Sequence, residues 1–334
     1  MKMRFLEYIK IFKWNGGVVL ENLTGSNKTP PSPTSVALGL FDGVHLGHRA
    51  VLNKTLEFEK ENLTSAIFTF STNSIPSKHN KKFEYIVDNE TKLNIIQKLG
   101  IKYAYSPDFL NFKELSAEAF VKLVLVDKLR AKKVICGKKF HFGKGAVCGF
   151  DELYNLGLKY GFEAVVVPPV MSGGKPISST IIRELIKNGE IVKANKLLGY
   201  NYYFEQIVSH GNKIGRTLNF PTINQYFKEN QLVPRYGVYA SYTYIEGEKF
   251  LSVTNIGVKP TVQNDKRPLA ETHILNYKGN LYGKIVNVVL YDFIRSECKF
   301  NSLEELKRVI SEDIENVKSR LVKFGGSLNY EYKS

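Results

Sequence analysis

Cysteine and long apolar runs are both scarce in this sequence of 334 residues. The three cysteines, Cys136, Cys148 and Cys298, are odd in number and lack the close spacing of metal-binding cysteines. This excludes a disulfide framework and a cysteine zinc site, and favours a reducing cytosol. No apolar run approaches the roughly 20 residues of a membrane span. Charges also interrupt the first ten residues, unlike a secretory signal. We therefore expect a cytoplasmic protein with no membrane-bound part.

The charge is strongly of one sign, with a formal net value of +15. The lysines are nevertheless spread through every segment, with no long basic block and no basic stripe interleaved with aromatic residues. We expect a lysine-rich solvated surface that attracts anionic nucleotides, and no nucleic-acid partner. An RNA-binding protein is the alternative from the binding class. Steeply salt-dependent RNA binding that ATP does not compete would support it.

The length favours two domains, and the two halves differ in texture. In the first half, short β-branched runs alternate with amphipathic stretches, as in a mainly parallel, doubly wound α/β sheet. We expect strands at residues 36–41, 64–70, 101–105, 133–136 and 163–167. We expect helices at residues 46–61, 89–99, 116–130 and 151–160. Ligands of such sheets bind at the carboxyl ends of the strands.

In the second half, short strands are separated by turns and no helical pattern lies between them, which indicates an antiparallel barrel or sandwich. We expect strands at residues 204–209, 237–245, 249–256, 270–276 and 284–293. A closing helix follows, with apolar residues from Leu303 to Val317 at three- and four-residue steps and Asn301 or Ser302 as its cap. Residues 187–203 would join the halves, giving domains at 1–188 and 189–334.

The segment Phe41-Asp-Gly-Val-His45-Leu-Gly-His48 follows the first strand and predicts a turn into a helix start. Helix N-termini carry unsatisfied N–H donors and partial positive charge, so this point suits a phosphate. The histidines can donate to ATP oxygens, and the glycines let the backbone approach closely. Alone, two histidines at this spacing are more often a surface pair or an incomplete metal site. Their position after a buried strand favours a nucleotide site.

A second helix start is predicted at Ile177-Ser178-Ser179-Thr180-Ile-Ile-Arg183. Its hydroxyl groups are good helix caps in any context. Together with the histidine turn, they would form the other wall of a triphosphate site, and Arg183 can reach a phosphate oxygen as a forked donor.

The second half has its own phosphate-type segment, from Gly211 through Phe220-Pro221-Thr222-Ile-Asn224. Its glycine loop can face phosphate oxygens, and the Thr222 hydroxyl and Asn224 amide are hard oxygen ligands on one face of an extended chain. Glu271, in an apolar β-rich segment, is the best candidate to accept a hydroxyl proton. Taken singly, Thr222 could end a strand and Glu271 could be an exposed strand residue. Arg295 and Glu297 could form an ion pair with each other or contact a ligand.

In this order, the motifs resemble those of the bacterial bifunctional riboflavin kinase/FMN adenylyltransferase (FAD synthetase) family, over nearly the whole chain. The resemblance implies a Rossmann-like nucleotidyltransferase domain followed by a small β-barrel flavokinase domain with a C-terminal helix. The barrel domain would phosphorylate riboflavin to FMN with ATP and Mg²⁺. The first domain would transfer AMP to FMN, giving FAD and pyrophosphate. Riboflavin, FMN and ATP are then the partners, and the oligomeric state is open.

The resemblance also implies roles for residues. His45, His48 and Arg183 would be catalytic in adenylyl transfer, and Glu271 in phosphorylation. The remaining nucleotide-binding residues would be Gly39, Phe41, Asp42, Gly43, Gly47, Ser178, Ser179, Thr180, Gly211, Lys213, Gly215, Arg216, Thr222 and Asn224. Thr222 and Asn224 would also hold the metal, and Glu271, Arg295 and Glu297 would bind flavin.

Two segments depart from the family pattern. The family usually carries a His-Pro motif after the second strand, where this chain has Phe70 to Ser77 and a displaced His79. Lys139 stands where the family tends to have Asn or Asp. These departures leave one alternative, a monofunctional riboflavin kinase with a degenerate nucleotidyltransferase domain. Formation of FAD from FMN and ATP would distinguish the two.

Overall fold

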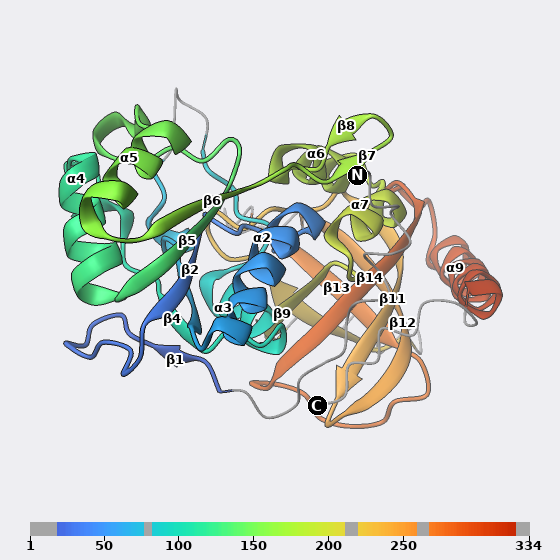
Figure 1. Ribbon diagram of the computed structural model, residues 1–334. Coiled ribbons are helices and arrows are strands. Elements are labelled where there is room, and N and C mark those ends of the chain that lie inside the picture. Colours follow the sequence, from blue (N-terminus) through green and yellow to red (C-terminus); the bar gives the residue numbers. More distant parts are fainter. Residues whose placement is uncertain (1–18, 77–81, 211–219, 259–266, 325–334) are drawn as a thin grey trace. The chain divides into compact units, whose positions relative to one another are not determined.

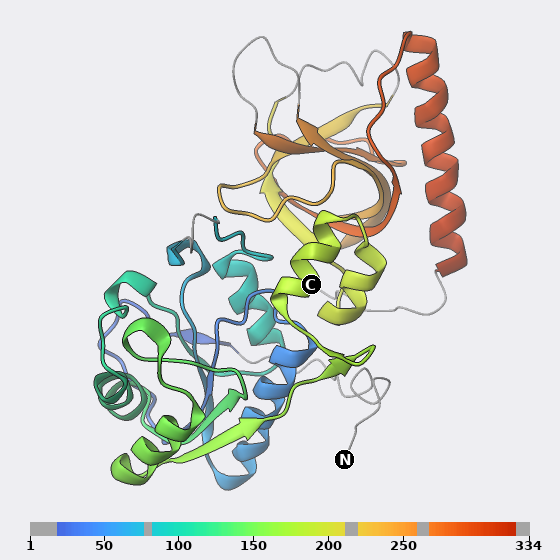
Figure 2. The same cartoon turned by 90° about the horizontal axis from the view of Figure 1, so that it is seen from above.

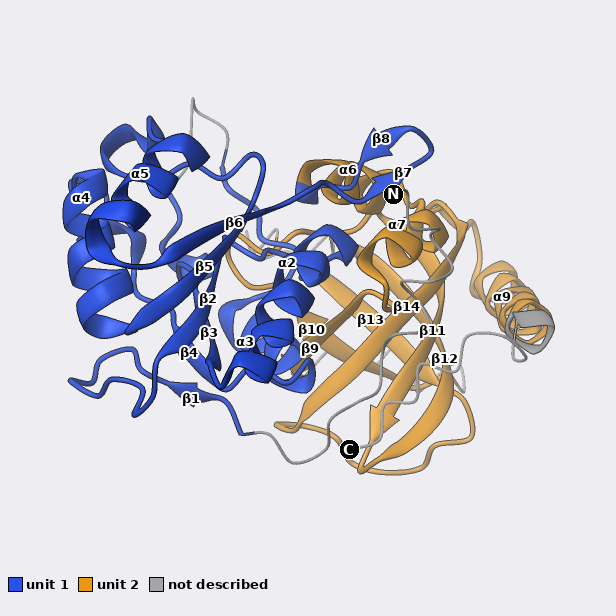
Figure 3. Ribbon diagram, viewed as in Figure 1, with its two compact units in different colours: residues 1–179 blue, residues 180–334 orange. Residues whose placement is uncertain are grey.

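A computed structural model describes residues 19–76, 82–210, 220–258 and 267–324 (Figure 1). The chain divides into two compact units, Met1–Ser179 and Thr180–Ser334 (Figure 3). The domain limits expected from the sequence, 1–188 and 189–334, stay a prediction, because a division by contacts does not show which segments fold independently. Within the described residues, no helix is both long and apolar enough to cross a membrane.

Unit 1 contains a six-stranded sheet in the order β1-β4-β3-β2-β5-β6, and all its strand pairs are parallel. Its strands are β1 (Glu21–Asn22), β2 (Thr34–Leu38), β3 (Thr64–Phe68), β4 (Tyr103–Tyr105), β5 (Ala131–Gly137) and β6 (Glu163–Val167). The strand order reverses beside β2, which is where open α/β sheets bind ligands. The doubly wound α/β prediction is therefore confirmed.

Helices cover both faces of this sheet (Figure 1). They are α2 (Leu46–Glu57), η1 (Phe58–Glu61), α3 (Asn89–Lys98), α4 (Ala117–Phe120), η4 (Val121–Lys128) and α5 (Phe150–Tyr160). Val36, Leu38 and Phe68 pack with buried residues of α4, η4 and α5. Ala37 and Ile67, equally buried, alternate with them and so point to the opposite face, where α2 packs. One helix was expected at 116–130, but its larger part is a π-helix, in which Leu129 N donates to Val124 O (2.9 Å).

Unit 2 is built on a six-stranded antiparallel sheet in the order β10-β13-β12-β11-β14-β9. Its strands are β9 (Tyr203–Ile207), β10 (Thr222–Tyr226), β11 (Gly237–Ile245), β12 (Glu248–Val258), β13 (Pro268–Ile274) and β14 (Ile285–Arg295). A bridge between Ser209 and Asn224 links the two outer strands, so the sheet is nearly closed. This confirms the predicted antiparallel barrel.

Five hydroxyl-bearing residues lie fully buried inside the barrel and bond to one another. Ser241 Oγ is 2.9 Å from Ser252 Oγ and 2.8 Å from Thr254 Oγ1. Thr254 Oγ1 continues to Thr272 Oγ1 (2.9 Å), and Thr243 donates to Ser252 Oγ (2.9 Å). Each hydroxyl can donate one hydrogen bond and accept others. This hydroxyl chain therefore satisfies its own polar groups where water has no access.

Helix α9 (Leu303–Phe324) packs against the barrel, as Figure 2 shows. Its Val317 is fully buried against Val238, Ala240 and Tyr291. Ser302 caps the helix: Glu305 N donates to Ser302 Oγ (3.1 Å), and Asn301 N donates to Glu305 Oε2 (2.8 Å). The closing helix and its cap were both predicted, but Leu303 itself is 61% exposed.

Besides the two-residue β1, a strand, a helix and a small hairpin were not foreseen. Strand β10 is absent from the predicted set, because its residues were interpreted only as a ligand-binding motif. Helix α7 (Ile191–Leu198) occupies the expected junction, and Gly199 ends it in a left-handed conformation. Its buried face, Ile191, Ala194 and Leu198, has helical spacing that is easily missed in so short a segment. A small hairpin, β7 (Met171–Ser172) with β8 (Lys175–Pro176), precedes α6 (Ser179–Lys187).

Candidate active sites

The histidine turn lies where β2 ends and α2 begins. His45 is the N-cap of α2, and its Nδ1 accepts a hydrogen bond from the backbone N–H of His48 (3.2 Å). The two imidazole rings stack, with centroids 3.6 Å apart and planes 15° apart. Because Nδ1 of His45 accepts, the proton of the neutral ring sits on Nε2, a donor suited to a phosphate oxygen. The sequence-predicted pair is thus brought together at a helix N-terminus.

The turn is strained, and the surrounding chain holds it. Phe41 has φ 53° and Val44 has φ 35°, values that are rare for residues other than glycine. The Asp42 carboxylate accepts hydrogen bonds from Ile86 N (2.9 Å) and Val87 N (3.5 Å). Phe41 and Asp42 are each only 1% exposed, so both lie beneath the turn surface. Their predicted contact with the nucleotide stays a prediction.

Two glycines of the motif are required by close packing. A Cβ at Gly39 would lie 3.0 Å from the ring of Phe41, and one at Gly47 would lie 3.0 Å from Cε1 of His45. Gly43 is needed for a different reason, since its φ is 77°. Any side chain at Gly47 would therefore push on the imidazole of His45.

The Ser-Ser-Thr motif meets the histidine turn within unit 1. Ser179 Oγ donates to the carbonyl oxygen of Asp42 (2.9 Å), joining residues 137 positions apart in the sequence. Gly47 also lies near the carbonyl of Ile177, immediately before Ser178. Thr180 and Arg183 follow on α6, beyond the division between the units, and belong to unit 2. Their role at the nucleotide stays a prediction.

Sequence reasoning missed Lys92, whose side chain reaches the same turn from α3. Its Nζ donates to the carbonyl oxygen of Phe70 (2.6 Å), and the residue is fully buried. A signal was present in the sequence. Lys92 lies three and four residues before the buried Ile95 and Ile96, on the apolar stripe of its helix.

In unit 2, the predicted catalytic and metal-binding residues form a row across three strands. Glu271 on β13 lies directly opposite Asn224 on β10 and directly opposite Asn255 on β12. Thr222 shares this face of β10 and lies opposite His273, whose Nδ1 donates to the carbonyl of Pro221 (2.9 Å). The carboxylate therefore lies between two amide-bearing neighbours. Asn255 belongs to this row although the sequence did not single it out as a site residue.

A pocket of about 350 Å³ opens beside Thr222. Its lining is mainly apolar and aromatic, with a few polar groups, as in small-molecule sites. The lining residues are Val208, Pro221, Thr222, Ile223, Thr272, Ile274, Tyr277, Gly279, Asn280, Leu281 and Tyr282. On one side, the His210 ring stacks on Tyr282 with centroids 4.1 Å apart. The predicted residues Gly211, Lys213, Gly215 and Arg216 lie outside the described part of the chain, as does His79.

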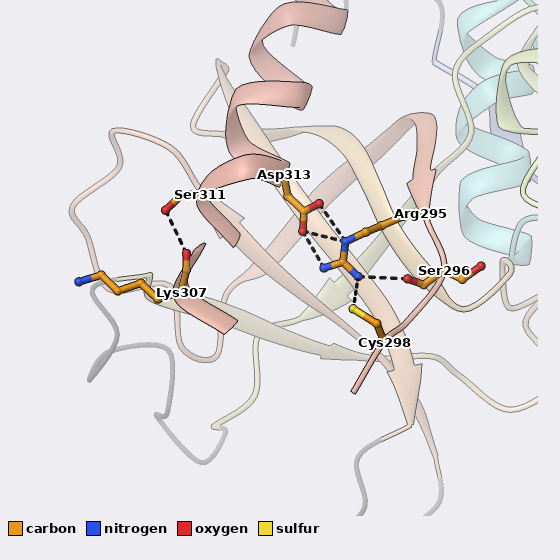
Figure 4. A network of polar contacts seen from close by, with 6 residues as sticks. All are labelled: Arg295, Ser296, Cys298, Lys307, Ser311 and Asp313. Carbon is orange, nitrogen blue, oxygen red and sulfur yellow. Dashed lines mark hydrogen bonds and ion pairs between the residues drawn. The ribbon is translucent and has the colours of Figure 1, made fainter. Parts of the chain in front are cut away.

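Arg295 is paired with a residue that the sequence did not suggest (Figure 4). Its guanidinium donates to both carboxylate oxygens of Asp313 on α9, with the shortest contact at 2.8 Å. It also donates to Ser296 O and to Cys298 Sγ, each at 3.1 Å. Glu297 instead lies against Gly257, where a Cβ would come within 2.0 Å of the carboxylate. The carboxylate beside Arg295 is thus Asp313, and flavin contact by Arg295 or Glu297 stays a prediction.

The fold and these sites define a transferase of two nucleotide-using units, a Rossmann-like nucleotidyltransferase and a barrel kinase. Two family models match: FAD synthetase over residues 27–181 and riboflavin kinase over residues 198–321. Among curated proteins, the bifunctional riboflavin kinase/FMN adenylyltransferase of Listeria monocytogenes is 36% identical, over 86% of this chain and 92% of that protein. The Escherichia coli K12 protein of the same description is 34% identical, over 88% and 95%.

The chain therefore belongs to the bifunctional riboflavin kinase/FMN adenylyltransferase family. A crystal structure described as a macrolide-efflux protein from Streptococcus pneumoniae has the same architecture. It is 27% identical, with a TM-score of 0.79, over 90% of this chain and 99% of that one.

Proposed function

We propose that this protein converts riboflavin to FMN in unit 2 and FMN to FAD in unit 1, using ATP in both steps. The observation that supports this proposal is that each compact unit contains one of the two predicted phosphate-type motifs. One is the stacked histidine pair at the start of α2, and the other is the row formed by Asn224 and Glu271 beside a pocket. Family membership supports both activities.

For the kinase step, Glu271 would accept the proton of the riboflavin ribityl hydroxyl as that oxygen attacks the γ-phosphorus of ATP. The pocket beside Thr222 has an apolar and aromatic lining that suits the adenine base. Phosphoryl transfer depends on positioning and charge stabilisation rather than on a covalent intermediate with the protein. The rigid barrel strands that carry Thr222, Asn224 and Glu271 supply that positioning.

The residues of β10 fit Mg²⁺ by their donor chemistry. Thr222 and Asn224 offer a hydroxyl and an amide oxygen on one face of the strand, next to the carboxylate of Glu271. Mg²⁺ suits sites of this type, in which most ligands are phosphates and water. When bound, it would neutralise charge on the ATP phosphates. Among the described residues, no group of three or more His, Cys, Asp or Glu side chains is placed to hold a metal.

For adenylyl transfer, an FMN phosphate oxygen attacks the α-phosphorus of ATP, the bond to the bridging oxygen breaks, and pyrophosphate leaves. The protein must hold both reactants in line and stabilise charge on the leaving group. His45 and His48, stacked at the N-terminus of α2, would donate to phosphate oxygens. Ser178, Ser179, Thr180 and Arg183 would contact the same triphosphate.

Two separate assays test the proposal, one starting from riboflavin and one from FMN, each with ATP and Mg²⁺ and chromatographic detection of products. Glu271→Gln should reduce FMN formation by about 10²- to 10⁴-fold and leave FAD formation from supplied FMN intact. His45→Ala should reduce FAD formation by about 10²- to 10³-fold and leave the kinase step intact. Loss of both activities in either variant would contradict two separate sites. Absence of FAD with the wild type would support the monofunctional kinase.

We also infer a cytoplasmic location, from the free thiols of Cys136, Cys148 and Cys298 and from intracellular substrates. We infer that nucleic acid is not a partner, since the positive charge is dispersed along the sequence.

A further inference from the structure

Lys92 is a buried cation that the proposed reaction does not use directly. It lies on α3, is 0% exposed, and is among the largest fully buried side chains of the described chain. Lysine is almost never fully buried unless its ammonium group is paired. The Nζ of Lys92 therefore needs hydrogen-bond partners inside the protein.

The ammonium group lies where two adjacent parallel strands end. Nζ is 2.6 Å from the carbonyl oxygen of Phe70, 3.1 Å from Thr69 Oγ1 and 3.5 Å from the carbonyl oxygen of Leu40. Phe70 follows β3 and Leu40 follows β2. The Thr69 hydroxyl itself donates to Leu40 O (2.9 Å), so Lys92 and Thr69 together join the two strand ends. The protonated side chain has three N–H donors and the neutral amine has two, so Nζ can donate to these acceptors in either form.

The contact with Leu40 immediately precedes the strained turn. Phe41, the next residue, has a positive φ, and so does Val44, just before the N-cap residue His45. Backbone strain of this kind persists only where surrounding contacts determine the conformation. Asp42 fixes the far side of the turn through Ile86 N, and Lys92 fixes its near side through Leu40 O. Asp42 is also the charged group that acts on Lys92 electrostatically.

We propose that Lys92 is a positioning residue for adenylyl transfer: the hydrogen bonds of its Nζ join the ends of β2 and β3 and so set the placement of the turn that carries His45 and His48. This inference rests on the proposed activity of unit 1. Lys92 does not touch the substrate in this role, because it has no exposed surface. Displacement of a catalytic group by about 1 Å can lower a rate by about 10²-fold, so the geometry of this anchor matters for turnover.

The test compares Lys92→Met with the wild type in both assays, and uses Lys122→Met, an exposed lysine of the same unit, as the matched control. Methionine fills similar space and removes the three donors. We expect the kcat of FAD formation to fall by about 10- to 100-fold, with the KM for FMN within about twofold of the wild type. The kinase step and the Lys122→Met protein should match the wild type.

A merely structural role would instead reduce the amount of folded protein without changing the kcat of the folded fraction. The folded fraction of each protein is therefore measured by circular dichroism and thermal unfolding, and kcat is expressed per folded molecule. A second variant, Thr69→Val, keeps Lys92 and removes the hydroxyl that bridges it to Leu40. It should also lower the kcat of FAD formation, by a smaller factor. If Lys92→Met does not fold, the kcat of Thr69→Val tests the role of Lys92 instead.

The outcomes separate this role from the proposed function. If the wild type forms FAD and the folded variants keep its kcat, the role of Lys92 is wrong while the proposed function stands. If the wild type forms no FAD, the role of Lys92 and the proposed adenylyl transfer in unit 1 are both wrong.

Discussion

The carboxylate of Asp313 faces the guanidinium group of Arg295 and accepts hydrogen bonds from both Nε (3.0 Å) and Nη2 (2.8 Å) (Figure 4). The Asp313 side chain is 6% exposed and that of Arg295 is 27% exposed, so the pair is largely withdrawn from water. It ties α9 to the end of β14. The neighbouring residue, Glu312, pairs with Arg308 on the exposed face of the same helix, at 54% and 64% exposure.

These two adjacent carboxylates should therefore behave very differently. Asp313→Ala leaves a poorly solvated guanidinium without its partner and should destabilise unit 2 by about 3 kcal/mol. Glu312→Ala removes an exposed pair and should change stability by less than about 0.5 kcal/mol. Urea unfolding followed through the kinase unit measures both. Equal effects of the two substitutions would show that the Arg295 pair is no stronger than a surface contact.

Gly257 leaves no room for a side chain beneath Glu297. Gly257→Ala would place a methyl group at the position of the Glu297 carboxylate, 2.0 Å from Oε1. Because the obstructed atoms end a flexible, exposed side chain, Glu297 should move with little loss of stability. If Glu297 binds flavin, the KM for riboflavin should rise several-fold while the melting temperature changes by only a few degrees. Gly149→Ala, which meets no atom within 4 Å, is the control.

Lys92 predicts a pH dependence of stability. Burial lowers the pKa of Lys92 from 10.5 to about 7, against the opposing effect of Asp42. Between these pH values the unfolded chain binds a proton that the folded chain does not, so the stability of unit 1 rises with pH in this window. The gain falls away as the pH drops towards 7. Between pH 7 and 9 it amounts to about 2–3 kcal/mol.

This gain should be absent from Lys92→Met and present in Lys122→Met. Thermal unfolding of the three proteins at pH 7 and pH 9 measures it. A Lys92→Met protein that gains as much stability as the wild type over this range would show that another group is responsible.

The hydroxyl chain in the barrel predicts graded effects. Thr254 bonds to both Ser241 and Thr272, whereas Thr243 contributes one side-chain bond, to Ser252. Thr254→Val interrupts the middle of the chain and should destabilise unit 2 by about 2–3 kcal/mol. Thr243→Val shortens the chain at its end and should have about half that effect. Denaturant unfolding distinguishes the two, and a larger loss for Thr243→Val would contradict the observed connectivity.

Much of the fold follows from local patterns. The buried β-branched runs predicted every strand of the six-stranded sheet of unit 1 except the two-residue β1, and strand β6 has the predicted bounds. The apolar spacing from Leu306 to Val317 predicted α9, and Ser302 was a recognisable cap. Such features depend on residues that are neighbours along the chain, which is why the sequence alone indicates them.

The parts that escaped prediction depend on which distant residues meet. Arg295 had two nearby candidates, a flavin or Glu297, but its carboxylate comes from Asp313, 18 residues further along. A clue was available, since Asp313 lies one helical turn before the buried Val317. Lys92 had a similar clue on α3. A charged residue on an apolar stripe indicates burial, but only the assembled fold reveals its partner.

Glu271 and His45 lie in different compact units, and each is expected to serve one of the two reactions. Substitution of one residue therefore need not abolish the reaction that depends on the other. Two defective proteins, one altered at each position, should complement each other in a single tube, because the protein altered at His45 still makes FMN, which diffuses to the protein altered at Glu271. The vitamin would still be converted to its dinucleotide form, although neither protein alone could catalyse both steps.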